Sequence, residues 1–140
     1  MPKKLIRVIL LVFLGIFAAQ GSLVALEKKS SLALTHYIMA LLYDGKGELN
    51  LAVREYEEAL KLDNENPLVH LNLAVTLIKN NEVRRAREEL DYASKLSPQA
   101  TEPHAILALL NLTEGKLDLA AQEYEITLKN ASNLNPKNID

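Results

Sequence analysis

The chain has no cysteine and no tryptophan, and its 140 residues include only five prolines, five glycines and 5% aromatic residues. The absence of cysteine excludes disulfide bonds, thiolate nucleophiles, zinc sites with cysteine ligands and a lipid anchor on cysteine. Scarce proline, glycine and aromatic residues favour helices over a β-sandwich. With 49% hydrophobic and 24% charged residues, the composition is that of one folded domain, which we expect to be all-α.

The N-terminal part of the chain, 1–29, forms a separate segment. The basic start MPKKLIR precedes a run without charge, 8–26, and Glu27 ends that run. As a helix the run would be about 28 Å long, close to the roughly 30 Å of a bilayer core. Two interpretations stay open: a transmembrane anchor, or a signal peptide cleaved at the small residues of 19–21. Both predict that residues 30–140 lie on the non-cytoplasmic side of a membrane, periplasmic or extracellular.

The net charge of residues 27–140 argues against a nucleic-acid partner. Residues 27–140 carry 13 Lys and Arg against 18 Asp and Glu, a net charge of −5. Nucleic-acid binding surfaces are basic, so we expect no nucleic-acid partner.

The rest of the sequence repeats with a period of about 34 residues. The alanine column is Ala52, Ala86 and Ala120, and Tyr56, Leu90 and Tyr124 form the column four positions later. A fixed period over three copies predicts a tandem array with repeats at about 33–66, 67–100 and 101–134, and 135–140 looks like the start of a fourth. In each unit one helical pattern (33–45, 67–79, 101–113) precedes a turn with Gly or Asn and a second helical pattern from Leu49, Val83 and Leu117.

These columns resemble the tetratricopeptide repeat family, whose 34-residue unit pairs two antiparallel helices with small residues where they cross. The resemblance covers 33–130 and implies a right-handed superhelix of hairpins, here preceded by a single hydrophobic N-terminal helix. Asn64 departs from the family, because it stands where a proline is usual and where the next unit has Pro98. Leu134 stands about four residues later than the repeat places the equivalent of Leu96, so we expect the last helix to be about one turn longer.

The end of the array lacks the polar helix that normally covers the last apolar face. Two interpretations stay open: the chain is a fragment of a longer protein, or another molecule covers this face.

His36, His70 and His104 fall in one column and invite a metal site. Equivalent residues of adjacent hairpins are separated by at least the roughly 8 to 10 Å between packed helices, whereas zinc needs ligand atoms at about 2 Å. We therefore interpret the histidines as partly buried packing residues and expect no metal.

Three arginines, Arg84, Arg85 and Arg87, resemble a phosphate-binding patch. Each lies four positions before an acidic residue of the same helix, and these are Glu88, Glu89 and Asp91. Pairing along the helix predicts a self-neutralised, solvated face, although a weak contact with acidic lipid or protein stays open.

The sequence contains no combination of nucleophile, base and orienting group, and no Gly-rich phosphate loop. We therefore expect no enzymatic activity and no cofactor.

The family resemblance implies that the first helix of each hairpin lines a concave groove. The positions that point into this groove are all uncharged, and they are Tyr37, Leu41, Leu71, Val75, Ile78, Ala105, Leu109 and Leu112. Some family members hold acidic chaperone tails with five clamp positions, which here are Tyr37, Leu41, Asn72, Glu102 and Ile106. Only Asn72 matches the clamp, so Asn72 joins the groove residues but we expect no chaperone-tail binding.

An exposed apolar strip predicts a scaffold at the cell envelope that holds an apolar or amphipathic protein segment. The alternative is a structural, membrane-anchored subunit or spacer of an envelope assembly, whose apolar surface packs beside the helix of 8–26. These side chains could also simply bury one another.

Overall fold

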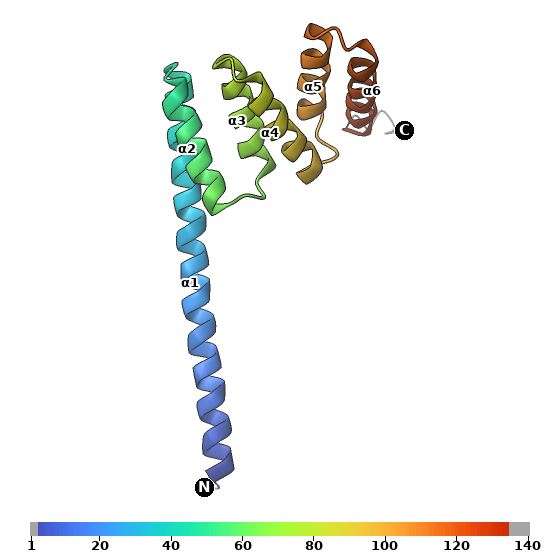
Figure 1. Ribbon diagram of the computed structural model, residues 1–140. Coiled ribbons are helices and arrows are strands. Elements are labelled where there is room, and N and C mark those ends of the chain that lie inside the picture. Colours follow the sequence, from blue (N-terminus) through green and yellow to red (C-terminus); the bar gives the residue numbers. More distant parts are fainter. Residues whose placement is uncertain (1–2, 135–140) are drawn as a thin grey trace, which may run out of the picture.

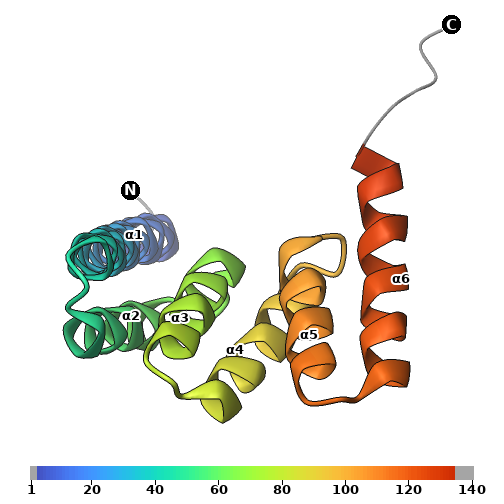
Figure 2. The ribbon, with the colours of Figure 1, turned by 90° about the horizontal axis from the view of Figure 1, so that it is seen from above.

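The computed structural model describes the backbone of residues 3–134 and the side chains of residues 22–133. This part of the chain consists of six helices (Figure 1). They are α1 (Lys3–Gly45), α2 (Leu49–Leu62), α3 (Pro67–Lys79), α4 (Val83–Leu96), α5 (Glu102–Thr113) and α6 (Leu117–Leu134). Each odd-numbered helix packs on the following one, and the three hairpins touch through α2 with α3 and α4 with α5. In Figure 2, α1, α3 and α5 lie along one side of the array, and α2 and α4 lie along the other.

The helix boundaries follow from the repeat. The second helices of the three hairpins begin at the predicted residues, and α3 spans the predicted 67–79. Helix α6 has 18 residues against 14 in α2 and in α4, which confirms the longer last helix.

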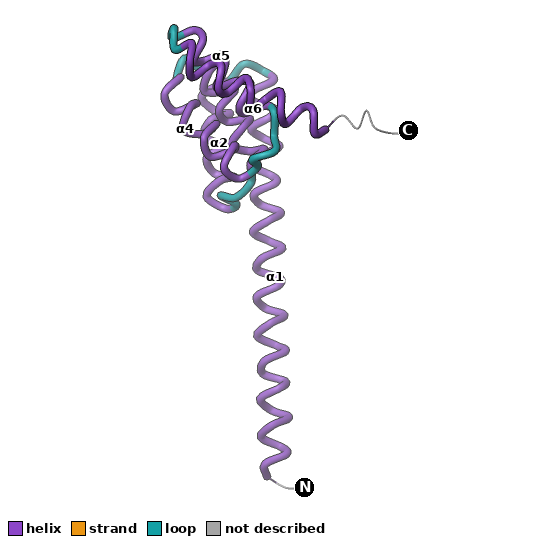
Figure 3. The backbone as a smooth tube through the Cα atoms, turned by 90° about the vertical axis from the view of Figure 1, so that its right-hand side faces the viewer, coloured by secondary structure: helices purple, strands orange, loops and turns teal. Residues whose placement is uncertain are grey.

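Helix α1 differs from the prediction, because the first helix of hairpin one and the N-terminal segment form one continuous helix. Residues 22–44 contain neither glycine nor proline, so nothing in the backbone ends the helix before the array begins. Figures 1 and 3 show the N-terminal part of α1 projecting away from the hairpins.

Turns in each hairpin use the Gly and Asn column that the sequence predicts. Gly47, Asn81 and Gly115 have φ of 78°, 63° and 73°. This left-handed conformation suits glycine and is tolerated by asparagine, and it closes the first helix of each hairpin.

The link between hairpins one and two replaces the usual proline with local hydrogen bonds. Asn66 caps α3, because its side-chain oxygen accepts from the backbone N–H of Leu68 at 3.2 Å and of Val69 at 3.4 Å. The carbonyl of Asn64 lies 3.1 Å from Nε2 of His70.

The core follows the alanine column. Ala52 and Ala86 are fully buried, which lets the helices approach closely, and Tyr56 and Leu90 fill the space beside them. The structure thus confirms the predicted packing in hairpins one and two, whereas Tyr124 in the same column of hairpin three is exposed.

Among residues 22–133, whose side chains the structure describes, no helical stretch is long and apolar enough to cross a membrane. The predicted anchor or signal run, 8–26, lies outside the described side chains as far as residue 21.

Candidate partner-binding surfaces

The nine predicted groove residues all lie on α1, α3 and α5, but they do not line one common hollow. Tyr37 borders a hollow near the α2–α3 link, and Leu71 borders another beside Pro103. Ala105, Leu109 and Leu112 line a third, between α5 and α6. The predicted groove residues at the middle of the array, Leu71, Asn72, Val75 and Ile78, are half-buried, whereas Leu41, Ala105, Leu109 and Leu112 are exposed. The exposed apolar surface is therefore concentrated at the ends.

Polar side chains join α1 to α3. The amide of Asn72 donates to the hydroxyl of Tyr37 at 2.9 Å. The carboxylate of Asp44 accepts from the hydroxyl of Thr76 at 3.1 Å and pairs with the ammonium of Lys79 at 2.7 Å. Asn72, the one residue that matches the chaperone clamp, is thus engaged in the contact between hairpins one and two.

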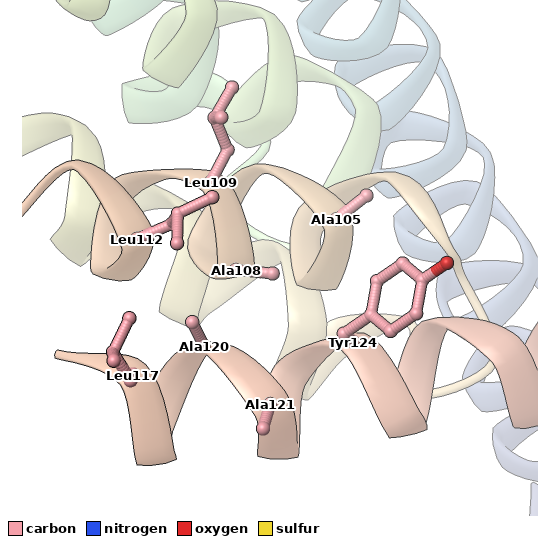
Figure 4. A pocket seen from close by; sticks show the side chains of 8 residues that line it. All are labelled: Ala105, Ala108, Leu109, Leu112, Leu117, Ala120, Ala121 and Tyr124. Atoms are coloured by element: carbon pink, nitrogen blue, oxygen red, sulfur yellow. The ribbon is translucent and has the colours of Figure 1, made fainter. Parts of the chain in front are cut away.

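An apolar groove of about 400 Å³ lies between α5 and α6 (Figure 4). Its lining contains no charged side chain and consists of Ala105, Ala108, Leu109, Leu112, Leu117, Ala120, Ala121 and Tyr124. In Figure 4, Leu117 and Ala120 point from α6 toward α5, whereas Leu109 points away from α6. We call this surface the end groove.

Every histidine pairs with a glutamate of the second helix in its own hairpin. The distances between Nδ1 and Oε2 are 2.7 Å for His36 and Glu55, 2.6 Å for His70 and Glu89, and 2.7 Å for His104 and Glu123. These pairs were not predicted, although the glutamates recur with the same period as the histidines and form a second column that could have revealed them. Among the described side chains, no three metal-binding groups lie together.

The pKa of His70 is raised. Burial acts to lower the pKa, but the hydrogen bond with Glu89, the Asn64 carbonyl and the nearby negative charges outweigh burial. Both ring nitrogens face acceptor oxygens, and only the protonated imidazole can donate to both.

This pair predicts a pH-dependent stability. Because folding raises the pKa of His70, the pair contributes fully to the free energy of unfolding below the unfolded pKa of about 6.5. This contribution is lost as pH rises through the folded pKa. We expect Glu89→Gln to lower the free energy of unfolding by about 1.5–3 kcal/mol at pH 5.5 and by less at pH 8.5. Urea unfolding followed by circular dichroism at both pH values measures the difference.

The matched control is Glu88→Gln, which removes the same charge from the exposed neighbouring position of α4. We expect it to change stability little at either pH. An equal cost of Glu89→Gln at the two pH values would contradict the role of His70.

The predicted pairing of the arginines along α4 was wrong for Arg85 and Arg87. Arg85 pairs with Glu57 of α2 and with Glu82, the residue before α4, and Arg87 pairs with Glu114 at 3.0 Å. The reason is that α4 lies between neighbouring helices that supply carboxylates, while Glu89 is already paired with His70. The acidic partners still neutralise these two arginines.

Comparisons with known proteins agree with the repeat. The sequence model of the tetratricopeptide repeat matches residues 45–110. Tetratricopeptide repeat protein 8 of Mus musculus is 32% identical over an alignment of 103 residues, and the alignment covers 71% of this chain and 20% of that protein. This chain therefore spans one fifth of the length of that relative.

Solved structures of two other proteins share the fold. The second TPR of Spaghetti (RPAP3), bound to HSP90 peptide SRMEEVD, superposes with a TM-score of 0.68 at 22% identity, covering 74% of this chain and 95% of that one. The crystal structure of MamA superposes with a TM-score of 0.72 at 16% identity, covering 74% of this chain and 61% of that one. At these identities the likeness shows the arrangement of the hairpins.

Proposed function

We propose that this chain, whose sequence and fold support the tetratricopeptide repeat family, is a non-catalytic scaffold that binds a protein segment through apolar side chains of α1, α3 and α5. The observation that carries the proposal is that Leu41 and Leu109, on the side formed by the first helices, are exposed, with no charged residue among the predicted groove positions. An apolar surface of this kind fits the apolar face of an amphipathic helix or an extended peptide.

A peptide partner also agrees with the TPR of Spaghetti, which is bound to a peptide. That peptide, SRMEEVD, is acidic, whereas this chain matches the clamp for acidic tails only at Asn72. We therefore propose an apolar or amphipathic segment in place of an acidic chaperone tail.

The proposed location is the cell envelope, with the hairpins on the non-cytoplasmic side. The basic start and the uncharged run 8–26 support it, and membrane fractionation with sequencing of the mature N-terminus tests it. The second candidate, a membrane-anchored structural spacer, is favoured by the continuity of α1 with the array.

The binding surface is tested with Leu41→Glu in the full-length chain. We expect the variant to lose the proteins that the unmodified chain captures from envelope extract, because a carboxylate would have to be desolvated against an apolar partner. Leu51→Glu is the control, since Leu51 has a similar exposure but lies on α2, on the other side. Capture of the same proteins by both variants would exclude partner binding through this apolar surface and leave the structural spacer.

A further inference from the structure

The two ends of the array expose columns that are buried inside it. At the α6 end, Tyr56 of hairpin one is 1% exposed and Leu90 of hairpin two is fully buried, but Tyr124 in the same column is 58% exposed. At the α1 end, Leu42 is 61% exposed, whereas its equivalent Leu110 is 7% exposed. Each end is thus one half of a junction that the chain already makes twice.

The first junction shows which positions meet when a hairpin is covered. Helix α3 covers the α1–α2 hairpin, and Thr76 meets Asp44 while Asn72 meets Tyr37. By the register of the repeat, Leu112 and Ala105 of the end groove correspond to Asp44 and Tyr37. On the outer face of α1, Leu42 and Ile38 correspond to Thr76 and Asn72.

Polarity is matched on the two sides of each junction. In the first junction the meeting residues are polar on both sides. In the second junction the equivalents are Ile78 with Leu110 and Leu71 with Ile106, and all four lie in the hydrophobic core or pack against it. At the free ends, the same register would bring Leu112 against Leu42 and Ala105 against Ile38. Both free surfaces are therefore apolar, as in the second junction.

We propose that the end groove binds the outer face of α1 from a second copy of this chain, seated as α3 is seated on hairpin one. We choose α1 of a second copy as the occupant because the exposed face of α1 carries the same repeat columns with which α3 and α5 cover hairpins one and two. The groove contains no charged side chain and the α1 face offers Ile38, Met39 and Leu42, so association buries apolar surface on both sides. Different surfaces meet, so this contact adds copies in a line and does not close a two-fold dimer.

Charge variants at the two ends test the proposal in the full-length chain, kept in nonionic detergent because of the run 8–26. Tyr124→Glu blocks the end groove and Leu42→Glu blocks the α1 face, and both positions are exposed enough to accept a carboxylate without unfolding. Light scattering should show a mass above that of a dimer for the unmodified chain, a single chain for each variant alone, and a dimer for the mixture. Leu51→Glu should associate like the unmodified chain.

Engineered cysteines test the register, because the chain has no cysteine of its own. The equivalents of Leu112 and Leu42 in the first junction have side-chain oxygens 3.1 Å apart, so Leu112→Cys and Leu42→Cys should form a disulfide between copies. The link should form when the two single-cysteine variants are mixed and not within either one alone.

Three results would overturn the proposal. A single-chain mass for the unmodified protein would show that copies do not associate through the end groove. Disulfides within one single-cysteine variant would indicate a two-fold dimer, and association that survives Tyr124→Glu would place the contact elsewhere. Leu41→Glu, which tests the binding of other proteins, should leave association unchanged, so the two functions fail separately.

Discussion

Tyr56→Ala is expected to lower the free energy of unfolding by about 3–5 kcal/mol. The side chain is buried between the alanines of α2, and its ring centroid lies 6.1 Å from that of Tyr37. Burial, and then the nearby Asp44, raise the pKa of the Tyr56 hydroxyl to about 12, so the hydroxyl is neutral near pH 7. Alanine would leave a cavity between hairpins one and two.

The matched control is Tyr124→Ala, the same substitution in the same column. Tyr124 borders the end groove and is mostly exposed, so we expect a change below about 1 kcal/mol. Urea unfolding of both variants in a Leu42→Glu background, which prevents association, gives the comparison. Similar costs at the two positions would show that Tyr56 is not the packing centre that the structure indicates.

Ala86→Leu is expected to cost about 1–3 kcal/mol, because the larger side chain has no space at a fully buried helix crossing. The backbones of α4 and its neighbours would have to separate, or the leucine would adopt an unfavourable rotamer. The same urea measurement, together with the helical circular dichroism signal, checks this prediction.

Ala121→Leu is the comparison in hairpin three, because Ala121 is exposed and borders the end groove of about 400 Å³. We expect little loss of stability there, since the groove has room for a leucine, and we expect association of copies to weaken because the side chain fills the space for α1. A loss as large as that of Ala86→Leu would mean that the end groove is not open in solution.

The sequence predicts most of the fold because the repeat makes each helix visible three times. A single alanine such as Ala52 says little, but its recurrence at Ala86 and Ala120 predicts where helices cross, and the structure confirms the close packing. The turn residue Asn81 is likewise recognised from its alignment with two glycines, which identifies the left-handed turn.

Side-chain partners were harder to predict, because they depend on which helices are neighbours in space. The rule for pairs four positions apart considers one helix only, and it assigned Glu89 to Arg85, whereas Glu89 pairs with His70 of α3. The candidate groove illustrates the same limit. The family resemblance places Leu71 and Leu112 in one groove, but Leu71 packs between two hairpins, whereas Leu112 borders the end groove, which no hairpin in the described part of the chain covers.

The continuity of α1 also has a mechanical consequence. Between residues 22 and 44 the helix has no glycine or proline, so no flexible joint separates the hairpins from the residues before them. Whatever holds α1 near residue 22 therefore sets the direction in which the array faces, and a torque applied there turns all three hairpins together. Each residue inserted after Glu27 would rotate the array by about 100° around the α1 axis and move it by about 1.5 Å. The number of residues in α1 thus sets the orientation of the array around the helix axis.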